Sequence, residues 1–440
     1  MRFFAPLTGL SLLAAGCAHG NPPGVTDGTP RIPPSYGSGF SVADRQRAER
    51  YLAEAATLCA RDRGRLWGLS LCGPVAIVDI TAHALATNEP PPAAEPPAAF
   101  GYANAAIDWG GRRWTTVMWQ QLNAAEALGY GSGSLLMHEL FHRIQVPLGL
   151  VFPDSHNDHL DTIEGRYWMQ LEFRALERAL QDSGAPRAGA LRDALAFRAA
   201  RHAAFPLAAE SERVAEINEG LAEYTGIAAA VPSPNARATA AIRRLESVLE
   251  QRTFVRPFGY GSGAAYGVLL ESWRPHWPRQ FTRNDDLSRL VQAASGLKPS
   301  TDMQAAAGRY GGVALRVAEE RRETERRTRV ADIRQRFVDG PVLVFPPAHK
   351  YSFAGDVIPI GDAGSIYPGF RAQEEWGTLE AAQVLIAADG SAVTVPAPTT
   401  RDGSKSTGDG WTFVLKGGWG IRPGSRPGDL RVVRAEMPPP

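Results

Sequence analysis

Two histidines in this 440-residue chain are spaced so that they could bind one metal ion. The segment His138-Glu139-Leu140-Phe141-His142 places them four residues apart, and that spacing puts both imidazoles on one face of an α-helix. Zinc held in this way needs a third protein ligand and keeps one position open for water. The carboxylate of Glu139 would lie beside that water and could remove its proton. The pattern therefore predicts a hydrolytic site with one Zn²⁺ per chain and Glu139 as general base.

A third ligand must come from another part of the chain, and the sequence offers several. The strongest candidate is Glu219, within a second helical segment at 216–226. Carboxylates and imidazoles that could bind the same ion also lie between the two segments. These alternatives are Glu164, Glu172, His156, His159 and Asp161.

The run Asn218-Glu219-Gly220-Leu221-Ala222 resembles the gluzincin metallopeptidases, in which a downstream helix supplies a glutamate as the third zinc ligand. The resemblance implies that Glu219 is that ligand. It also implies that Glu223, one helical turn later, hydrogen-bonds a ligand histidine and fixes its tautomer, with His138 as the expected partner. One departure is the spacing, because 76 residues separate His142 from Glu219, far more than in thermolysin-like members.

A weaker part of the resemblance lies in the glycine-rich run 258–266. It is similar to the Tyr-x-x-Gly-Ala segment of M1-type peptidases, whose tyrosine donates a hydrogen bond to the oxyanion of the transition state. The resemblance implies this role for Tyr260, with Tyr266 as the second choice. The alternative is a glycine-rich start of a helix with tyrosines in the core. The whole resemblance covers about residues 130–275.

The sequence pattern around these side chains predicts an α+β fold. It consists of a small N-terminal sheet, a mostly helical zincin-like body and a β-rich C-terminal region. The strand-like runs are 66–71, 75–80 and 113–119 in the first part, and 342–345, 384–387 and 411–415 in the last. Helical periodicity predicts helices at 42–62, 133–147, 161–182, 188–204, 208–230, 235–252, 263–274 and 309–337. We expect 113–119 to be an edge strand that holds an extended substrate. Trp114 and Trp119 on it are expected to pack in the core.

The N-terminal residues resemble a bacterial lipoprotein signal. Arg2 precedes an apolar run that ends at Cys17, the cysteine that would carry the lipid, although Ala14 stands where such signals prefer leucine. Plain cleavage near Ala18 is the alternative. We therefore expect a signal peptide at 1–17, a flexible tether at 18–40, a metallopeptidase domain at 41–338 and a β-rich domain at 339–440.

Export to the periplasm or outer membrane would allow the remaining cysteines to pair. Cys59 and Cys72 are thirteen residues apart, and we expect a disulfide between them rather than two separate buried thiols.

Composition excludes some classes of protein. With 44% apolar and 21% charged residues, the chain is not wholly disordered. A net charge of +1 gives no electrostatic reason to expect nucleic acid as a partner. The sequence thus predicts an exported zinc peptidase acting on peptide or protein substrates and attached to the membrane only through Cys17. A non-catalytic zinc-binding protein and a zinc hydrolase of a non-peptide bond are the alternatives.

Overall fold

The structure, a computed structural model, describes residues 39–97, 100, 101, 103–127, 131–153, 155–355 and 357–435. The expected signal peptide, Cys17 and nearly all of the expected tether lie outside these residues. The chain divides into two compact units, and in the described part the first ends at Glu320 and the second begins at Arg321. This division falls within the helix α12 (Gly312–Arg334). Among the described residues, no helix has the length and apolarity needed to cross a bilayer.

The first unit opens with α1 (Val42–Asp62), which begins where predicted because Ser41 caps the backbone N–H of Asp44. A four-stranded sheet follows, with the order β2-β1-β4-β3. Its strands are β1 (Val75–Asp79), β2 (Ala84–Thr87), β3 (Ala105–Trp109) and β4 (Arg112–Met118). β1 and β4 are parallel, and the other two pairs are antiparallel.

The prediction that 113–119 forms an edge strand is wrong. β4 is an inner strand because β3 pairs with its other side. A tight hairpin through Gly110 and Gly111, both at positive φ, brings β3 back along β4. Trp114 and Trp119 are buried in the core, as predicted.

The predicted strand at 66–71 is also wrong, since this stretch is a series of turns. Gly64 and Gly68 adopt φ values of 71° and 79°, which end any extended run. Trp67 still enters the core from this loop, where its ring lies 4.8 Å from that of Phe141 and its Nε1 donates to Thr225. The apolar character of 66–71 therefore reflects burial and not strand formation. At the ends of the loop, Cys59 and Cys72 form the predicted disulfide.

The rest of the first unit is helical, and most of its helices agree with the predicted ranges. The helices are α2 (Trp119–Ala127), α3 (Ser132–Leu148), α4 (Ile163–Gln181), α5 (Gly184–Ala204), α6 (Ala208–Ala215), α7 (Leu221–Ala230), α8 (Pro234–Leu249), α9 (Phe258–Leu270), α10 (Leu287–Ser295) and α11 (Met303–Arg309). Of these, α2, α10 and α11 were not predicted. The predicted single helix 208–230 is interrupted by a π-helical turn, η2 (Glu216–Gly220).

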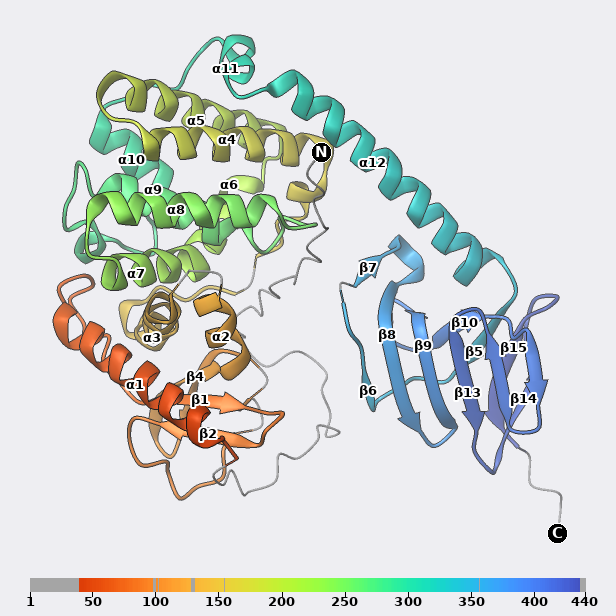
Figure 1. Ribbon diagram of the computed structural model, residues 1–440. Helices are drawn as coiled ribbons and strands as arrows, with labels where there is room; N and C mark the ends of the chain where they lie inside the picture. Colours follow the sequence, from red (N-terminus) through yellow and green to blue (C-terminus); the bar gives the residue numbers. More distant parts are fainter. Residues whose placement is uncertain are drawn as a thin grey trace, which may run out of the picture. The chain divides into compact units, whose positions relative to one another are not determined.

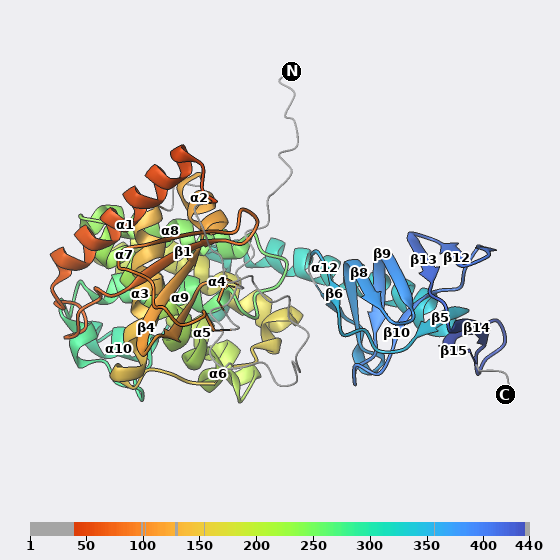
Figure 2. The same cartoon turned by 90° about the horizontal axis from the view of Figure 1, so that it is seen from below.

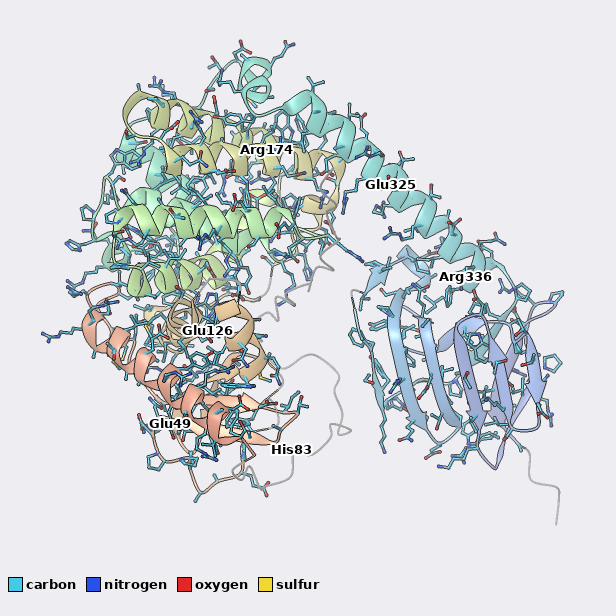
Figure 3. All side chains as sticks on the ribbon, viewed as in Figure 1. Glu49, His83, Glu126, Arg174, Glu325 and Arg336 are labelled. Carbon is cyan, nitrogen blue, oxygen red and sulfur yellow. A yellow bond between two sulfur atoms is a disulfide. The ribbon has the colours of Figure 1, made fainter. Side chains whose placement is uncertain are left out.

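Helix α3 lies between the small sheet and the helical layer (Figures 1 and 2). It contacts β3 and β4 on one side and α7 on the other, and its apolar residues Leu136, Leu140 and Ile144 are buried. Side chains also join the outer helices of this unit. Arg174 of α4, labelled in Figure 3, donates to the carbonyl oxygen of Tyr310 at 2.6 Å.

The second unit is built around a single β-sheet, in agreement with the predicted β-rich region. Its main path runs β11-β12-β13-β9-β10-β5-β15-β14, with β8 pairing with β6, β7 and β9. The strands are β5 (Val342–Phe345), β6 (Tyr351–Ser352), β7 (Ile358–Pro359), β8 (Ser365–Glu374), β9 (Gly377–Ile386), β10 (Val393–Pro396), β11 (Thr400–Asp402), β12 (Lys405–Gly408), β13 (Trp411–Leu415), β14 (Trp419–Pro423) and β15 (Leu430–Arg434). Its core includes the ring contacts of Phe345 with Trp376 and Phe413.

Candidate metal centre

Three side chains from two helical segments bring their donor atoms together inside the first unit. Nε2 of His138 lies 3.1 Å from Nε2 of His142, both on α3. Oε2 of Glu219, on η2, lies 3.6 Å from the first of these nitrogens and 3.7 Å from the second. Among the described residues, these three form the group of histidine, cysteine and acidic side chains that could hold a metal ion.

The geometry of this group fits a small divalent cation. Donor atoms at bond lengths of about 2.0–2.1 Å and tetrahedral angles lie about 3.3–3.5 Å apart. The three observed separations bracket that range. Oε2 of Glu219 is buried and accepts no hydrogen bond, although buried carboxylate oxygens are normally paired. A cation among the three atoms would supply the missing partner.

The turn that carries Glu219 departs from α-helical geometry. The N–H of Leu221 donates to the carbonyl oxygen of Glu216, five residues earlier, so the helix widens at this point. π-turns of this kind occur often at functional sites. In a regular α-helix, glutamates at 212, 216, 219 and 223 would share one face. Here the first two contact arginines of α5, whereas the last two contact His138.

Glu223 contacts the histidine that the resemblance implied. Its Oε2 lies 3.2 Å from Nδ1 of His138, and its Oε1 accepts a 2.7 Å hydrogen bond from Nε of Arg244. Burial alone would lower the pKa of His138, but the carboxylates of Glu219 and Glu223 outweigh it and raise that pKa to about 10. With Nδ1 facing Glu223, Nε2 is the nitrogen directed at the ligand group.

His142 has an equivalent partner that sequence reasoning missed. Oε1 of Gln145 lies 2.6 Å from Nδ1 of His142. The amide nitrogen of the same Gln145 donates to the carbonyl oxygens of Ile217 and Asn218, at 3.0 and 3.1 Å. Gln145 therefore joins His142 to the turn that carries Glu219, the third candidate ligand. Its position three residues after His142 is visible in the sequence, but its contact with 217–218 depends on the tertiary fold.

Glu139 is buried and is held by an asparagine from the sheet. Nδ2 of Asn104 donates to Oε1 of Glu139 at 2.7 Å, and Oδ1 of Asn104 accepts from the backbone N–H of Met118. Asn104 is only 2% exposed and stands directly before the edge strand β3. Sequence reasoning missed this residue, since nothing local to it indicates a functional role.

The two tyrosines of the glycine-rich segment lie in different places. The ring of Tyr260 stacks on that of His138, with centroids 5.8 Å apart and planes inclined by 5°. Glu219 has a pKa lowered to about 2, because contacts with His138, His142 and Tyr260 outweigh the effect of burial. The hydroxyl of Tyr266 instead donates to Glu172 at 2.7 Å, well inside the core. Tyr260 is thus the tyrosine that lies beside the candidate ligands.

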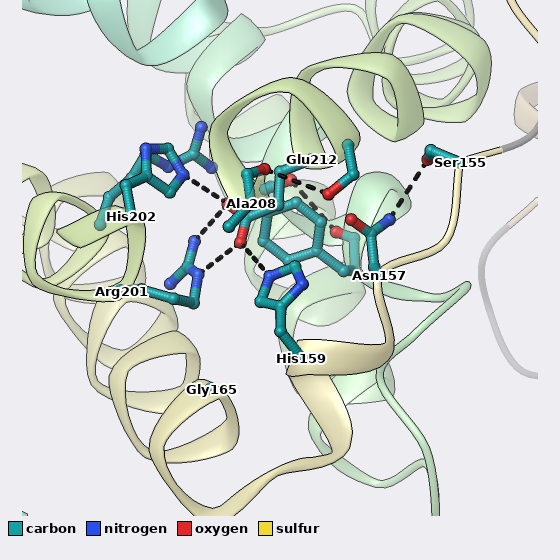
Figure 4. Close-up of polar contacts among 12 residues, drawn as sticks. Ser155, Asn157, His159, Gly165, Arg201, His202, Ala208 and Glu212 are labelled. Atoms are coloured by element: carbon teal, nitrogen blue, oxygen red, sulfur yellow. Dashed lines mark hydrogen bonds and ion pairs between the residues drawn. The ribbon is translucent and has the colours of Figure 1, made fainter. Parts of the chain in front are cut away.

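The alternative ligands have other partners. Nε2 of His159 lies 2.8 Å from Glu212, which also accepts from Arg201 and contacts His202 (Figure 4). Burial would raise the pKa of Glu212, but the guanidinium of Arg201 holds it well below its usual range. The remaining alternatives are also outside the group: Glu164 pairs with Arg316, Glu172 with Arg198 and Arg201, Asp161 with Thr253, and His156 is exposed.

Glycines permit the close packing that brings the ligand segments together. A Cβ atom on Gly220 would lie 2.6 Å from the carbonyl oxygen of Gly259 and 2.8 Å from Cα of Gly263. η2 can therefore rest directly on α9, which carries Tyr260. A Cβ atom on Gly226 would overlap the carbonyl oxygen of Ser134, so this glycine sets the approach of α7 to α3 beside His138.

Comparisons with protein-family models, with curated proteins and with solved structures found no match to this chain. The arrangement of donor atoms on α3 and η2 is therefore the basis for assigning a function.

Proposed function

We propose that this protein is a zinc-dependent peptidase of the gluzincin kind, exported and anchored through Cys17. The single observation that carries the proposal is the convergence of His138, His142 and Glu219 on one point, with donor atoms 3.1 to 3.7 Å apart. Two imidazoles and one carboxylate are a ligand set typical of catalytic zinc, which keeps an open coordination position.

Zinc, when bound by these residues, would supply a Lewis acid and a water of lowered pKa. Glu139 follows His138 directly on the same helix, and its carboxylate would accept the proton of the attacking water and pass it to the leaving amine. Asn104 holds one of its oxygens at 2.7 Å and so restricts the direction of the other. Tyr260, stacked on His138, would donate a hydrogen bond from its hydroxyl to the developing oxyanion.

The presence of Glu139 favours an enzyme over a non-catalytic zinc protein. A structural site is closed by its ligands and has no use for a neighbouring base. Here a carboxylate that is 2% exposed is retained beside the ligands, at a cost in desolvation, and is oriented by its own hydrogen bond. That arrangement supports hydrolysis, whether the bond cleaved is a peptide or another acyl bond.

The proposal is tested by metal analysis and peptide cleavage on the purified protein. We expect one zinc per chain in the parent, loss of zinc in Glu219→Ala, and retention in Glu246→Ala, a matched control on the exposed side of α8. Glu139→Gln should keep its zinc and cleave a fluorogenic peptide library about 10²- to 10⁴-fold more slowly. A parent without zinc would refute the metal site. A zinc-loaded parent that cleaves no peptide would refute the peptidase proposal.

A further inference from the structure

A concave site lies in the first unit, and its lining does not include the candidate metal ligands. Its volume is about 710 Å³, which is in the size range of small-molecule sites. The walls come from the ends of helices: the last turns of α1, α7 and α9, and the start of α8. Helix ends bring polar backbone groups to the surface of the cavity.

The lining is rich in arginine. Arg61, Arg65, Arg187 and Arg237 all face this cavity, together with the carboxylates of Asp62 and Glu271. Four guanidinium groups against two carboxylates leave a formal charge of +2. A ligand that carries about two negative charges would neutralise this site.

Within the described part of the chain, three of these arginines donate hydrogen bonds to carbonyl or hydroxyl oxygens and to no carboxylate. Arg61 donates to the carbonyl oxygen of Ala229 at the end of α7, at 2.9 Å. Arg65 donates to backbone carbonyls within its own turn. Nε of Arg187 donates to the carbonyls of Ala179 and Asp182, and its Nη1 to the hydroxyl of Ser272. These contacts orient the side chains but do not neutralise their charge.

Both carboxylates that line the cavity already accept hydrogen bonds from other groups of the protein. Asp62 accepts the backbone N–H groups of Gly64 and Leu66, which fixes the turn after α1. Glu271 accepts from the hydroxyl of Tyr224 and pairs with Arg237 at 3.0 Å. Asp62 also interacts electrostatically with Arg65, whereas Arg61 and Arg187 donate to carbonyl and hydroxyl oxygens.

Structural capping of helix C-termini explains part of this arrangement, since arginine often donates to terminal carbonyls. It does not account for the number of donors. A guanidinium has five N–H donors, and Arg61 uses one of them on Ala229. The remaining donors of a side chain with fixed orientation are suited to a planar or tetrahedral oxyanion. The N-terminus of α8, with Pro234 and Asn235 in the cavity wall, adds a further positive potential.

We propose that this cavity, between Arg61 on α1 and Arg187 on α5, binds a phosphate-bearing small molecule or headgroup. A phosphate monoester carries about 1.5 to 2 negative charges at neutral pH, which matches the charge of the lining. Two anchored guanidiniums can each present a pair of donors to its oxygens. This inference does not depend on the proposed peptidase activity, because none of the cavity residues belongs to the metal centre.

The test uses pyrophosphate titrated into the metal-free protein by calorimetry. We expect saturable binding that weakens as NaCl is raised, because charge attraction is screened. Arg61→Ala and Arg187→Ala should each weaken it about 10-fold, the effect of losing one strong charged hydrogen bond. Arg50→Ala, an exposed arginine on the same helix as Arg61, is the matched control and should bind like the parent. Equal weakening in Arg50→Ala would overturn the proposal, as would absence of binding to any phosphate probe.

Two further controls keep the result interpretable. Pyrophosphate binding must survive in His138→Ala, and its loss there would place the anion at the metal centre and overturn the proposal. If Arg187→Ala lowers the unfolding midpoint, the binding test relies on Arg61→Gln instead, because Arg61 is exposed.

Flotation with phosphatidic acid vesicles separates the two sources of phosphate. Arg61-dependent flotation without pyrophosphate binding identifies a lipid headgroup, and pyrophosphate binding without flotation identifies a soluble ligand.

Discussion

Oε1 of Glu139 accepts a 2.7 Å hydrogen bond from Nδ2 of Asn104, so the proposed base is tied to the polypeptide just before the edge strand β3. The same asparagine is fixed in turn by the backbone N–H of Met118 at the end of β4. The sheet thus orients a side chain of α3, the helix that carries both candidate histidine ligands. Geometry of this kind matters for a base because proton transfer requires a short and well-directed approach.

Asn104→Ala should lower kcat for peptide cleavage by about 10-fold while the zinc content stays at that of the parent, since the carboxylate loses its orientation but not its charge. The change also leaves the N–H of Met118 without its partner, and we expect a loss of about 1–3 kcal/mol in the free energy of unfolding. Kinetics, elemental analysis and urea denaturation on one preparation separate the two effects. Unchanged kcat in a folded variant would show that Glu139 does not depend on Asn104.

Glu223→Gln tests the contact between Glu223 and Nδ1 of His138, a candidate metal ligand. Removing the charge opposite Nδ1 of His138 should weaken zinc binding about 10- to 100-fold, as is typical for partners of ligand histidines. The affinity is measured by competition with a chromophoric chelator. Arg244→Gln is the companion variant, because it removes the positive charge that pairs with Glu223. We expect a smaller effect from it, and an equal zinc affinity in Glu223→Gln and the parent would contradict the assigned role.

Gly226→Ala tests the close approach of α7 and α3. The added methyl group would overlap the carbonyl oxygen of Ser134, so we expect a destabilisation of about 1–3 kcal/mol together with weaker zinc binding. Gly189→Ala on α5 is the matched control, because a Cβ atom there meets nothing within 4 Å. That variant should be stabilised by about 0.4–1 kcal/mol through reduced freedom of the unfolded chain. Thermal unfolding monitored by circular dichroism distinguishes the two directions of change.

Asp193 gives a prediction about acid stability. Burial would raise its pKa, but hydrogen bonds from Arg309, Ser300 and Tyr310 outweigh burial and hold the pKa below its ordinary value. The native state therefore releases this proton more readily than the unfolded state. The resulting stabilisation is complete above the unfolded pKa and is lost as the pH falls through the folded one.

Urea unfolding of the parent and Asp193→Asn between pH 2.5 and pH 6, a range chosen to span the ordinary aspartate pKa of about 3.9, checks this prediction. The difference in unfolding free energy between the two proteins should be largest at pH 6 and should shrink on acidification. A difference that stays constant across the range would show that Asp193 does not titrate differently on folding.

Residue spacing and patterns within short segments explain which features of the fold and the site could be predicted. His138 and His142 lie on one helix, so their i, i+4 spacing places both imidazoles on the same face in any tertiary arrangement. Glu219 and Glu223 were placed by their resemblance to a known pattern and by helical spacing. The disulfide between Cys59 and Cys72 likewise spans a short loop. The helix boundaries of α1 and α3 follow from Ser41 and from the apolar run around Leu136 and Ile144.

Several of the missed roles and pairings originate in contacts between segments that are remote in sequence. Asn104 and Gln145 gain their roles only when the sheet and η2 pack against α3. β4 became an inner strand because the short, alanine-containing β3 pairs with it, and a run such as Ala105–Trp109 carries little strand signal of its own. The apolar run 66–71 satisfied a strand pattern, yet two glycines at positive φ direct it into turns.

The π-helical turn η2 has a consequence for how this segment can vary. Each residue of an α-helix advances the side-chain direction by about 100°. The extra residue in η2 therefore gives Glu212 and Glu216 a different orientation about the helix axis from Glu219 and Glu223. The first pair contacts arginines of α5, and the second contacts His138. No point substitution can exchange the two orientations. A uniform α-helix of the same length would place all four glutamates on one face and would turn the carboxylate of Glu219 away from His138. The widened turn, together with the identity of its glutamates, is therefore what lets one short segment serve both α5 and His138.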